Sequence, residues 1–300
     1  MSITVSNISK SYKNVKALKD ISFEVKPAEL FGLIGPDGAG KTTLFRILTT
    51  LLFADKGNAT VANYDVVEDY KSIRNSVGYM PGKFSLYQDL TVEENLNFFA
   101  TIFGTTIEAN YDLIKDIYIQ IEPFKNRRAG KLSGGMKQKL ALCCALIHKP
   151  KVLFLDEPTT GVDPVSRKEF WDMLKRLQKK DITILVSTPY MDEAELCDRI
   201  ALIHDGKILE IDTPESIVKH YPKPIYNVSA NNMYQLINSL NAYEFNHSVY
   251  PFGEFVHYTD SRTDFNPTEL KTYLESKNSS NIIIERTIAT IEDTFMELAK

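Results

Sequence analysis

The sequence predicts an α/β protein of two domains, in which a mixed-sheet core carries a helical insert and a small α/β unit follows. Three observations support this. Strand-like runs occur at both ends of residues 1–222, and stretches with helical spacing alternate with them. A segment with two prolines, HYPKPIY (220–226), then separates this part from the rest of the chain. The length of 300 residues suffices for two such domains.

The N-terminal part is expected to be rich in strands. Within residues 2–34, ITV and ISFEV show alternation or β-branching, and LFGLIG is an apolar run that leads into glycine. A helix is predicted from about Gly40 to Leu52. A further β stretch is expected to run from GNATV to VGYM and to end near Met80.

The middle of the chain changes character. From about Thr91 to Pro150 the apolar residues recur at helical spacing, most clearly in TVEENLNFFATIF, which predicts a helical subdomain over about 85–150. Strand signals return at KVLFL, ITILV, RIALIH and GKILEI, with the helical stretch VSRKEFWDMLKRLQKK between the first two. Strand–helix–strand alternation favours parallel pairing in the core sheet.

Residues 223–300 are expected to form a separate small domain without a catalytic role. The pattern is strand YNVSA, helix NMYQLINSL, strands around HSVYPFGEFVHYT, helix PTELKTYLES, strand NIIIERT and helix IEDTFMELA. Apart from the last helix, this β-α-β-β-α-β order is typical of a ferredoxin-like unit.

Composition limits the functional classes. The net charge of −4 argues against a nucleic-acid-binding surface, which requires a basic face. No apolar run approaches the length of a membrane-spanning helix, and the N-terminus lacks the apolar core of a signal peptide. Cys143, Cys144 and Cys197 are an odd number of cysteines and two are adjacent, which predicts reduced thiols in an intracellular protein.

A glycine-rich loop is the first candidate site. GPDGAGKT (35–42) fits the pattern G-x-x-x-x-G-K-[ST] between a buried strand and a helix. Such a loop wraps backbone N–H groups around phosphate oxygens at a helix N-terminus, where the helix dipole also favours an anion. Lys41 is expected to reach the β- and γ-phosphates, and Thr42 to offer its hydroxyl to Mg²⁺. The predicted nucleotide-binding residues are Gly35, Pro36, Asp37, Gly38, Ala39, Gly40, Lys41, Thr42 and Thr43.

Two carboxylates end the apolar strand VLFLDEP (152–158). Because side chains alternate along a strand, Asp156 and Glu157 point in different directions and can take different roles. Asp156 suits the surroundings of Mg²⁺, and Glu157 is the candidate catalytic residue that orients or deprotonates an attacking water.

A second helix start that can bind an anion occurs in LSGGMKQ (132–138). Ser133 is expected to cap a helix, and the two glycines leave its first amides accessible. One nucleotide does not need two such cradles, so we expect this helix to contact a nucleotide on another subunit. The residues assigned to this contact are Ser133, Gly134, Gly135, Met136 and Gln138.

These elements, in this order, resemble the ATP-binding subunit of an ABC transporter, a member of the P-loop NTPases. The resemblance covers residues 1 to about 222, and LSGGMKQ matches the signature motif of that family. The sequence is most similar to exporter ATPases of the daunorubicin-resistance type, which also carry a small C-terminal domain ending in a phrase like TIEDTFMELAK (290–300).

The resemblance implies ATP and Mg²⁺ as ligands and a head-to-tail dimer that sandwiches two ATPs. Gly161 and Asp163 would then lie in the loop that meets the second subunit. Tyr12 would stack on adenine, although its spacing alone fits a partly buried core tyrosine equally well. Residues from about 80 to 105 would meet a membrane permease, which implies a peripheral protein on the cytoplasmic side of the cell membrane.

Two positions depart from the family pattern and are predicted to be degenerate. Gly82 replaces a glutamine after GYMP, and Pro189 replaces the histidine of STHYMDEAE. Pro189 is expected to act as the first helical residue behind Thr188. Gln88 is a candidate substitute for the glutamine, but a solvated loop residue is the preferred interpretation. Asp37 replaces a more common asparagine and adds negative charge near the phosphates.

The departures favour a subunit with unequal roles at two sites. Its own nucleotide is expected to hydrolyse slowly, while its signature helix completes a site on a more competent ATPase subunit. A partner that is a second copy of this chain remains an alternative. A non-hydrolysing regulatory ATP-binding module is a second hypothesis. A soluble ABC protein of translation or DNA repair is a third; the single cassette and the compact helical interval disfavour it.

Overall fold

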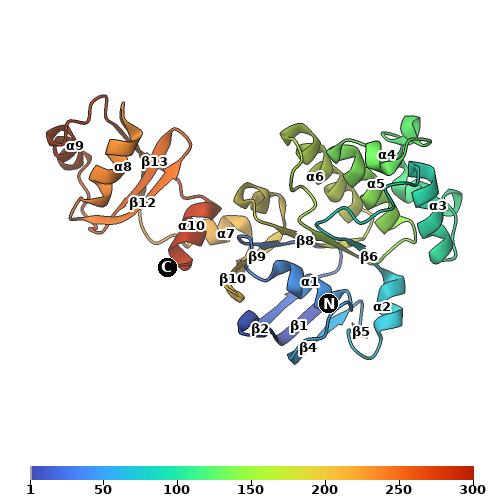
Figure 1. Cartoon of the computed structure of the whole chain (residues 1–300). Coiled ribbons are helices and arrows are strands. Elements are labelled where there is room, and N and C mark those ends of the chain that lie inside the picture. Colours follow the sequence, from blue (N-terminus) through green and yellow to red (C-terminus); the bar gives the residue numbers. More distant parts are fainter. Residues whose placement is uncertain (1) are drawn as a thin grey trace. The chain divides into compact units, whose positions relative to one another are not determined.

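The structure is a computed structural model that describes residues 2–300 (Figure 1). The chain divides into two compact units, one ending at Glu215 and the other spanning Ser216–Leu298. Helix α7 (Pro214–Lys219) spans this division, so the change of unit falls slightly before the predicted boundary at 222/223. Within residues 2–300 no helix combines the length and the apolar character needed to cross a bilayer.

A six-stranded mixed sheet forms the centre of the first unit. Its order is β10-β9-β3-β8-β7-β6, in which all neighbours are parallel except the edge pair β10 and β9. The parallel core agrees with the strand–helix–strand alternation of the sequence. The strands are β3 (Leu30–Ile34), β6 (Val77–Met80), β7 (Val152–Asp156), β8 (Thr183–Thr188), β9 (Arg199–His204) and β10 (Lys207–Asp212).

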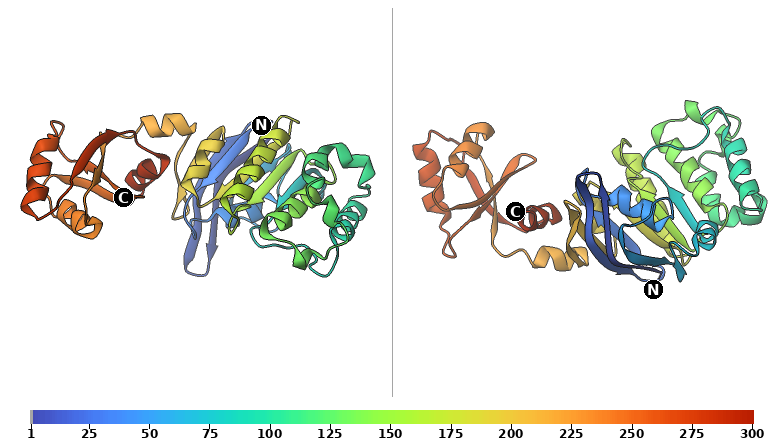
Figure 2. Two further views of the ribbon diagram at one scale, coloured as in Figure 1. Left: turned by 90° about the horizontal axis from the view of Figure 1, so that it is seen from above. Right: turned by 60° about the horizontal axis from the view of Figure 1, so that its bottom comes forward.

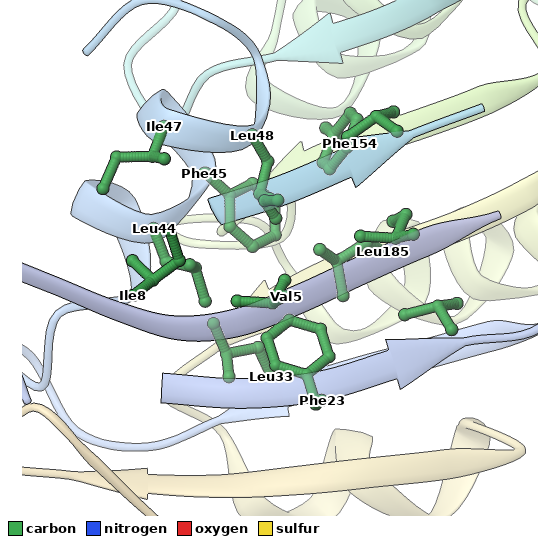
Figure 3. Packing of buried hydrophobic residues seen from close by; sticks show 14 of the residues in the cluster. Val5, Ile8, Phe23, Leu33, Leu44, Phe45, Ile47, Leu48, Phe154 and Leu185 are labelled. Carbon is green, nitrogen blue, oxygen red and sulfur yellow. The ribbon is translucent and has the colours of Figure 1, made fainter. Parts of the chain in front are cut away.

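A second, antiparallel sheet packs against the first, and helix α1 (Lys41–Leu48) shares one apolar core with both sheets. Its order is β2-β1-β4-β5, with β1 (Ile3–Tyr12), β2 (Val15–Val25), β4 (Lys56–Val61) and β5 (Tyr64–Asp65). Figure 3 shows Leu44, Phe45 and Leu48 of α1 among side chains of both sheets. Each fully buried side chain of this size contributes roughly 1.5–3 kcal/mol. The loop before α1 is therefore held on a rigid support.

Two expectations for this region are wrong. The predicted helix to Leu52 ends at Leu48, because Thr50 has a left-handed φ of 63° and Leu51 N–H turns back to Arg46 O at 2.7 Å. The predicted continuous β stretch to Met80 is interrupted by helix α2 (Tyr70–Ser76).

The insert between β6 and β7 is helical, as the apolar spacing predicts. It contains α3 (Val92–Ile102), α4 (Tyr111–Tyr118) and α5 (Gly134–Leu146), with short 3-10 turns between them. Thr91 begins α3 with a capping box, in which its hydroxyl accepts from Glu94 N and the Glu94 carboxylate accepts from Thr91 N. In Figures 1 and 2 α3 and α4 lie together at one end of the unit, apart from the blue N-terminal strands. Helix α6 (Pro164–Gln178) joins β7 to β8.

The second unit has the β-α-β-β-α-β order predicted from the sequence. Its sheet, β12-β13-β11-β14, is antiparallel throughout, and α8 and α9 contribute to its apolar core. This is the ferredoxin-like connectivity. The elements are β11 (Ile225–Ser229), α8 (Met233–Asn241), β12 (Asn246–Phe252), β13 (Phe255–Asp260), α9 (Pro267–Ser276), β14 (Ile283–Thr287) and the final helix α10 (Ile291–Leu298).

Candidate functional site

The glycine-rich loop joins the end of β3 to the first turn of α1. Gly38 and Gly40 have φ values of 81° and 107°, which side chains with a Cβ rarely adopt. A Cβ on Gly35 would lie 2.1 Å from Ile203 O, and one on Gly40 would lie 2.5 Å from Ala17 O. Glycine is therefore required at three positions, each by a local constraint. The backbone can wrap closely around an anion only under these conditions.

Lys41 is the buried cation of this loop, with a side chain only 3% exposed. Its Nζ donates to Gly35 O at 2.8 Å and to Pro36 O at 3.0 Å, and it forms an ion pair with Glu157 Oε1 at 3.1 Å. A buried ammonium must be paired in this way, because desolvation otherwise makes its charge costly. The contact joins the loop to the carboxylate strand.

Thr42 faces the other carboxylate. Its hydroxyl donates to Asp156 Oδ1 at 3.2 Å, and the Ser187 hydroxyl donates to the same oxygen at 2.7 Å. Asp156 is 2% exposed, so these hydroxyls replace the water that it loses. Burial, followed by the charge of Asp156, raises the pKa of Tyr79 to about 12. A hydroxyl and a carboxylate side by side are the oxygen ligands that Mg²⁺ prefers.

Glu157 lies beyond β7, which ends at Asp156, so its different contact does not follow from strand alternation. Its side chain is 22% exposed and reaches Lys41, and its backbone has a left-handed φ of 51°. The N–H of Glu157 is held by Ser187 O at 3.0 Å and by Ser187 Oγ at 3.1 Å. Such a backbone costs on the order of 1–3 kcal/mol and persists only where surrounding contacts fix it, which is typical of functional sites.

The remaining residues of the loop lie as the motif predicts. Ala39 is buried, Thr43 is in the first turn of α1, and Asp37 and Gly38 are exposed at the outer edge of the loop. Tyr12 ends β1 with 43% of its surface exposed, which favours the exposed interpretation over a core tyrosine.

The LSGGMKQ segment begins helix α5. Ser133 is the N-cap of α5, and its Oγ accepts from Met136 N at 3.4 Å. Gly134 is exposed, and a Cβ there would meet only Gly161 O, at 3.8 Å. A Cβ on Gly135 would instead lie 2.8 Å from Ser166 Oγ within the same chain. The packing of this chain therefore favours glycine at position 135, whereas position 134 has room for a Cβ.

Several predicted residues surround one pocket of about 170 Å³, among them Gly82, Gly134, Gln138, Glu157 and Gly161. Gly161 has a φ of 75°, and Asp163 caps α6 by accepting from Ser166 N at 3.0 Å. Hydrogen bonding from Ser166 holds the pKa of Asp163 below its usual value.

Position 82 leaves little room for a side chain. A Cβ there would lie 3.0 Å from Asp156 O and 3.8 Å from Glu157 Cβ, so a glutamine would require the loop to move. Gln88 is exposed, and its backbone carbonyl oxygen accepts from Gly130 N at 2.9 Å. This agrees with its interpretation as a solvated loop residue.

The expectation that Pro189 begins a helix is wrong. Tyr190 is extended, with φ −86° and ψ 115°, and the 3-10 helix η4 begins at Met191. The Thr188 hydroxyl accepts from Tyr190 N at 3.1 Å and donates to Glu193, which the sequence analysis did not assign. The Thr188 side chain thus closes a turn across Pro189, and no regular helical turn begins at the proline. Ser187 was also missed, since a small hydroxyl residue inside an apolar strand gives no pattern of its own.

The comparisons with known proteins agree with this geometry. Residues 18–160 match the family described as "ABC transporter". The chain is 43% identical over 221 residues to "Probable multidrug ABC transporter ATP-binding protein YbhF" of Escherichia coli (strain K12), covering 72% of this chain but only 38% of YbhF. It is 39% identical to "Doxorubicin resistance ATP-binding protein DrrA" of Mycobacterium tuberculosis (strain ATCC 25618 / H37Rv) over 225 residues, 73% of this chain and 68% of DrrA.

A solved structure shows the same fold. The structure described as "Dimeric Structure of MJ0796, a Bacterial ABC Transporter Cassette" superimposes with a TM-score of 0.64 and 25% identity, covering 70% of this chain and 98% of that one. The matched residues 18–160 include the glycine-rich loop (35–43, called the phosphate loop below), the two carboxylates at 156 and 157, and the start of α5 at Ser133. The chain therefore belongs to the ABC transporter family and contains its ATP-binding domain.

Proposed function

We propose that this chain is the ATP-binding subunit of an ABC-type exporter and couples ATP binding and hydrolysis to a membrane permease. The names of YbhF and DrrA, multidrug transport and doxorubicin resistance, support export. In this role the chain acts as a peripheral protein on the cytoplasmic side of the cell membrane, and residues 80–105 meet the permease. The permease chooses the transported substrate.

The nucleotide site consists of the residues predicted from the sequence. The amides of the loop from Gly35 to Thr43 bind the phosphates, Lys41 neutralises the terminal phosphates and Tyr12 stacks on adenine. Thr42 and Asp156, 3.2 Å apart, would hold Mg²⁺, which neutralises phosphate charge when bound. Glu157 orients the attacking water and accepts its proton.

The observation that supports this most strongly is the pairing of two loop residues with two carboxylates. Lys41 lies 3.1 Å from Glu157 and Thr42 lies 3.2 Å from Asp156, although the two segments are separated by more than a hundred positions. A glycine-rich turn that matched the pattern by chance would not be expected to place a cation and a hydroxyl beside two different carboxylates.

The signature helix supports a dimer in which Ser133, Gly134 and Gly135 bind the nucleotide of a second ATP-binding subunit. The exposed N-terminus of α5 and the dimeric MJ0796 cassette support this arrangement. Gly82 and Pro189 supply no side chain that can position water or contact phosphate. Loss of a proton-handling group costs about 10²–10⁴ in rate. We therefore infer a weak site in this chain and a heterodimer with a more competent subunit.

A non-hydrolysing module is the second candidate, and the same two positions favour it. Turnover by the purified chain separates the two hypotheses: a slow, Glu157-dependent release of phosphate supports the enzyme, and none supports the module.

The nucleotide site is tested by titrating the purified chain with a fluorescent ATP analogue. Lys41→Ala should abolish binding, because no other cation of residues 2–300 is seen to contact Gly35, Pro36 and Glu157 together. Lys139→Ala is the matched control, since Lys139 pairs with Glu169 at 2.8 Å, between α5 and α6 and away from the loop. An unchanged affinity in Lys41→Ala would refute the assignment of the phosphate loop.

A further inference from the structure

Glu193 is a buried carboxylate outside the assigned nucleotide site. It is 1% exposed and belongs to η4 (Met191–Leu196), which follows the β8 strand and Pro189. Carboxylates are rarely buried unless they are paired or hydrogen-bonded. One oxygen of Glu193 accepts from Thr159 Oγ1 at 2.7 Å, and the other accepts from the hydroxyl of Thr188. The two oxygens therefore hold two different segments of the chain.

The Thr188 side leads directly to the phosphate loop. The carbonyl oxygen of Thr188 accepts from Gly35 N at 3.2 Å, so the first residue of the loop is tied to the residue that Glu193 binds. Pro189 follows and has neither a backbone N–H nor a polar side chain. Through Thr188, Glu193 gives this segment a polar connection that residue 189 does not provide.

The Thr159 side leads to residues 158–163, here called the Thr159 loop. The carbonyl oxygen of Thr159 accepts from Val162 N at 3.2 Å, which closes a turn around Gly161. Asp163 then caps α6, the helix that carries Arg167. Arg167 Nε lies 3.7 Å from Glu193 Oε1 and is buried without a hydrogen bond in the described chain. The carboxylate of Glu193 therefore contacts both the Thr159 loop and the helix that follows it.

We propose that Glu193 is a positioning residue that couples occupancy of the phosphate loop to the Thr159 loop, the surface that the second ATP-binding subunit meets. Anion binding fixes Gly35, Gly35 fixes Thr188 and, through Glu193, Thr188 fixes Thr159. The inference rests on the proposed function, because it requires nucleotide at the phosphate loop. A competing route runs from Lys41 through Glu157 to Thr160, whose N–H donates to Glu157 O at 3.3 Å. A contiguous contact path is not evidence of coupling, so the two routes must be separated by experiment.

The variant Thr159→Val separates them, because it removes one hydroxyl at nearly constant shape and leaves Lys41 and Glu157 intact. The full-length chain is exchanged in deuterated buffer with and without Mg·ATP, and exchange is measured in peptides that cover residues 158–163. The Kd for a fluorescent ATP analogue is measured on the same samples. Thr159→Ser restores the hydroxyl and is the rescue variant. Thr183→Val removes another buried hydroxyl, at the opposite end of β8, whose contacts are Ser2 and Ala28 N.

The expected result has three parts. ATP slows exchange of the Thr159 loop in the unchanged chain, in Thr159→Ser and in Thr183→Val. Thr159→Val binds the analogue with an unchanged Kd but loses this slowing. A Thr159→Val chain that keeps the full ATP-dependent slowing would overturn the proposal and assign the coupling to the Glu157 route, and an unchanged chain that binds ATP without any slowing would also overturn it. A chain that binds no ATP would instead refute the proposed function.

Discussion

The two glycines of the signature helix should respond differently to the same substitution. A Cβ at position 135 would lie 2.8 Å from Ser166 Oγ and 3.1 Å from Ser166 Cβ. A Cβ at position 134 has its nearest neighbour, Gly161 O, at the ordinary contact distance of 3.8 Å. We therefore expect Gly135→Ala to destabilise the isolated chain, and Gly134→Ala to leave its stability unchanged or slightly raised.

The size of the effect follows from two opposing contributions. Forcing an extra methyl group against a packed neighbour costs about 1–3 kcal/mol. Replacing glycine by alanine inside a helix returns at most about 1 kcal/mol. A net loss of about 1–2 kcal/mol corresponds to a fall in Tm of roughly 2–8 °C for a unit of this size. Thermal unfolding of the purified variants, followed by circular dichroism, measures this difference.

A double-mutant cycle with Ser166→Gly assigns the cause. Removing the Ser166 side chain should abolish most of the penalty of Gly135→Ala, because both close contacts are to that side chain. Equal melting temperatures for Gly134→Ala and Gly135→Ala, or a penalty that survives Ser166→Gly, would refute the packing argument. The result also decides which glycine variant can test contact with a second subunit, because such a variant must not destabilise its own chain.

Three further predictions concern other parts of the chain. Tyr12→Ala should weaken ATP binding by about 1–3 kcal/mol, and Tyr12→Phe should not, if the exposed ring stacks on adenine; equal Kd values in a nucleotide titration would exclude stacking. A chain cut after residue 222 should keep its affinity for nucleotide, and a folded fragment that binds none would contradict the independence of the two domains. Burial opposes, but hydrogen bonds from His257 and Thr290 outweigh it and hold the pKa of Asp293 below its usual value. The stability that this carboxylate contributes is present above its unfolded pKa near 4 and is lost as pH falls through the lower folded value. In Asp293→Asn the free energy of unfolding of the second unit should therefore fall less steeply as pH is lowered, which denaturant unfolding at several pH values measures.

Local motifs predicted part of the geometry of the candidate site. The G-x-x-x-x-G-K-[ST] pattern predicted the position of the loop between β3 and α1. Asp156 and Glu157 do contact different loop residues, but strand alternation does not explain this, because Glu157 lies beyond the end of β7. Ser133 was predicted as a cap from its place before two glycines. Each of these inferences depends on residues within a few positions of one another, where sequence spacing determines geometry.

One feature that the sequence did not show depends on a contact between distant residues, and two others depend on local backbone geometry. Glu193 lies 34 positions from Thr159, so nothing in MDEAE indicates which of its acids is buried. Pro189 looks like a helix start in sequence, but the contact between Tyr190 N and the Thr188 hydroxyl delays the helix to Met191. Helix α1 ends before Thr50, which has a left-handed backbone. Glycine usually takes this conformation, so a threonine does not indicate it in the sequence.

The central claim is that this chain has a weak nucleotide site of its own and completes a competent site on a second subunit. Steady-state phosphate release by the reconstituted complex, measured for Glu157→Gln and Gly134→Ala, tests it most directly. Gly134→Ala should lower turnover by about 10²–10³, because it hinders the approach of backbone amides to the partner's nucleotide. Glu157→Gln acts on the weak site and should retain most of the activity. If Glu157→Gln abolishes turnover as completely as Gly134→Ala, or if Gly134→Ala leaves it undiminished, the claim is wrong.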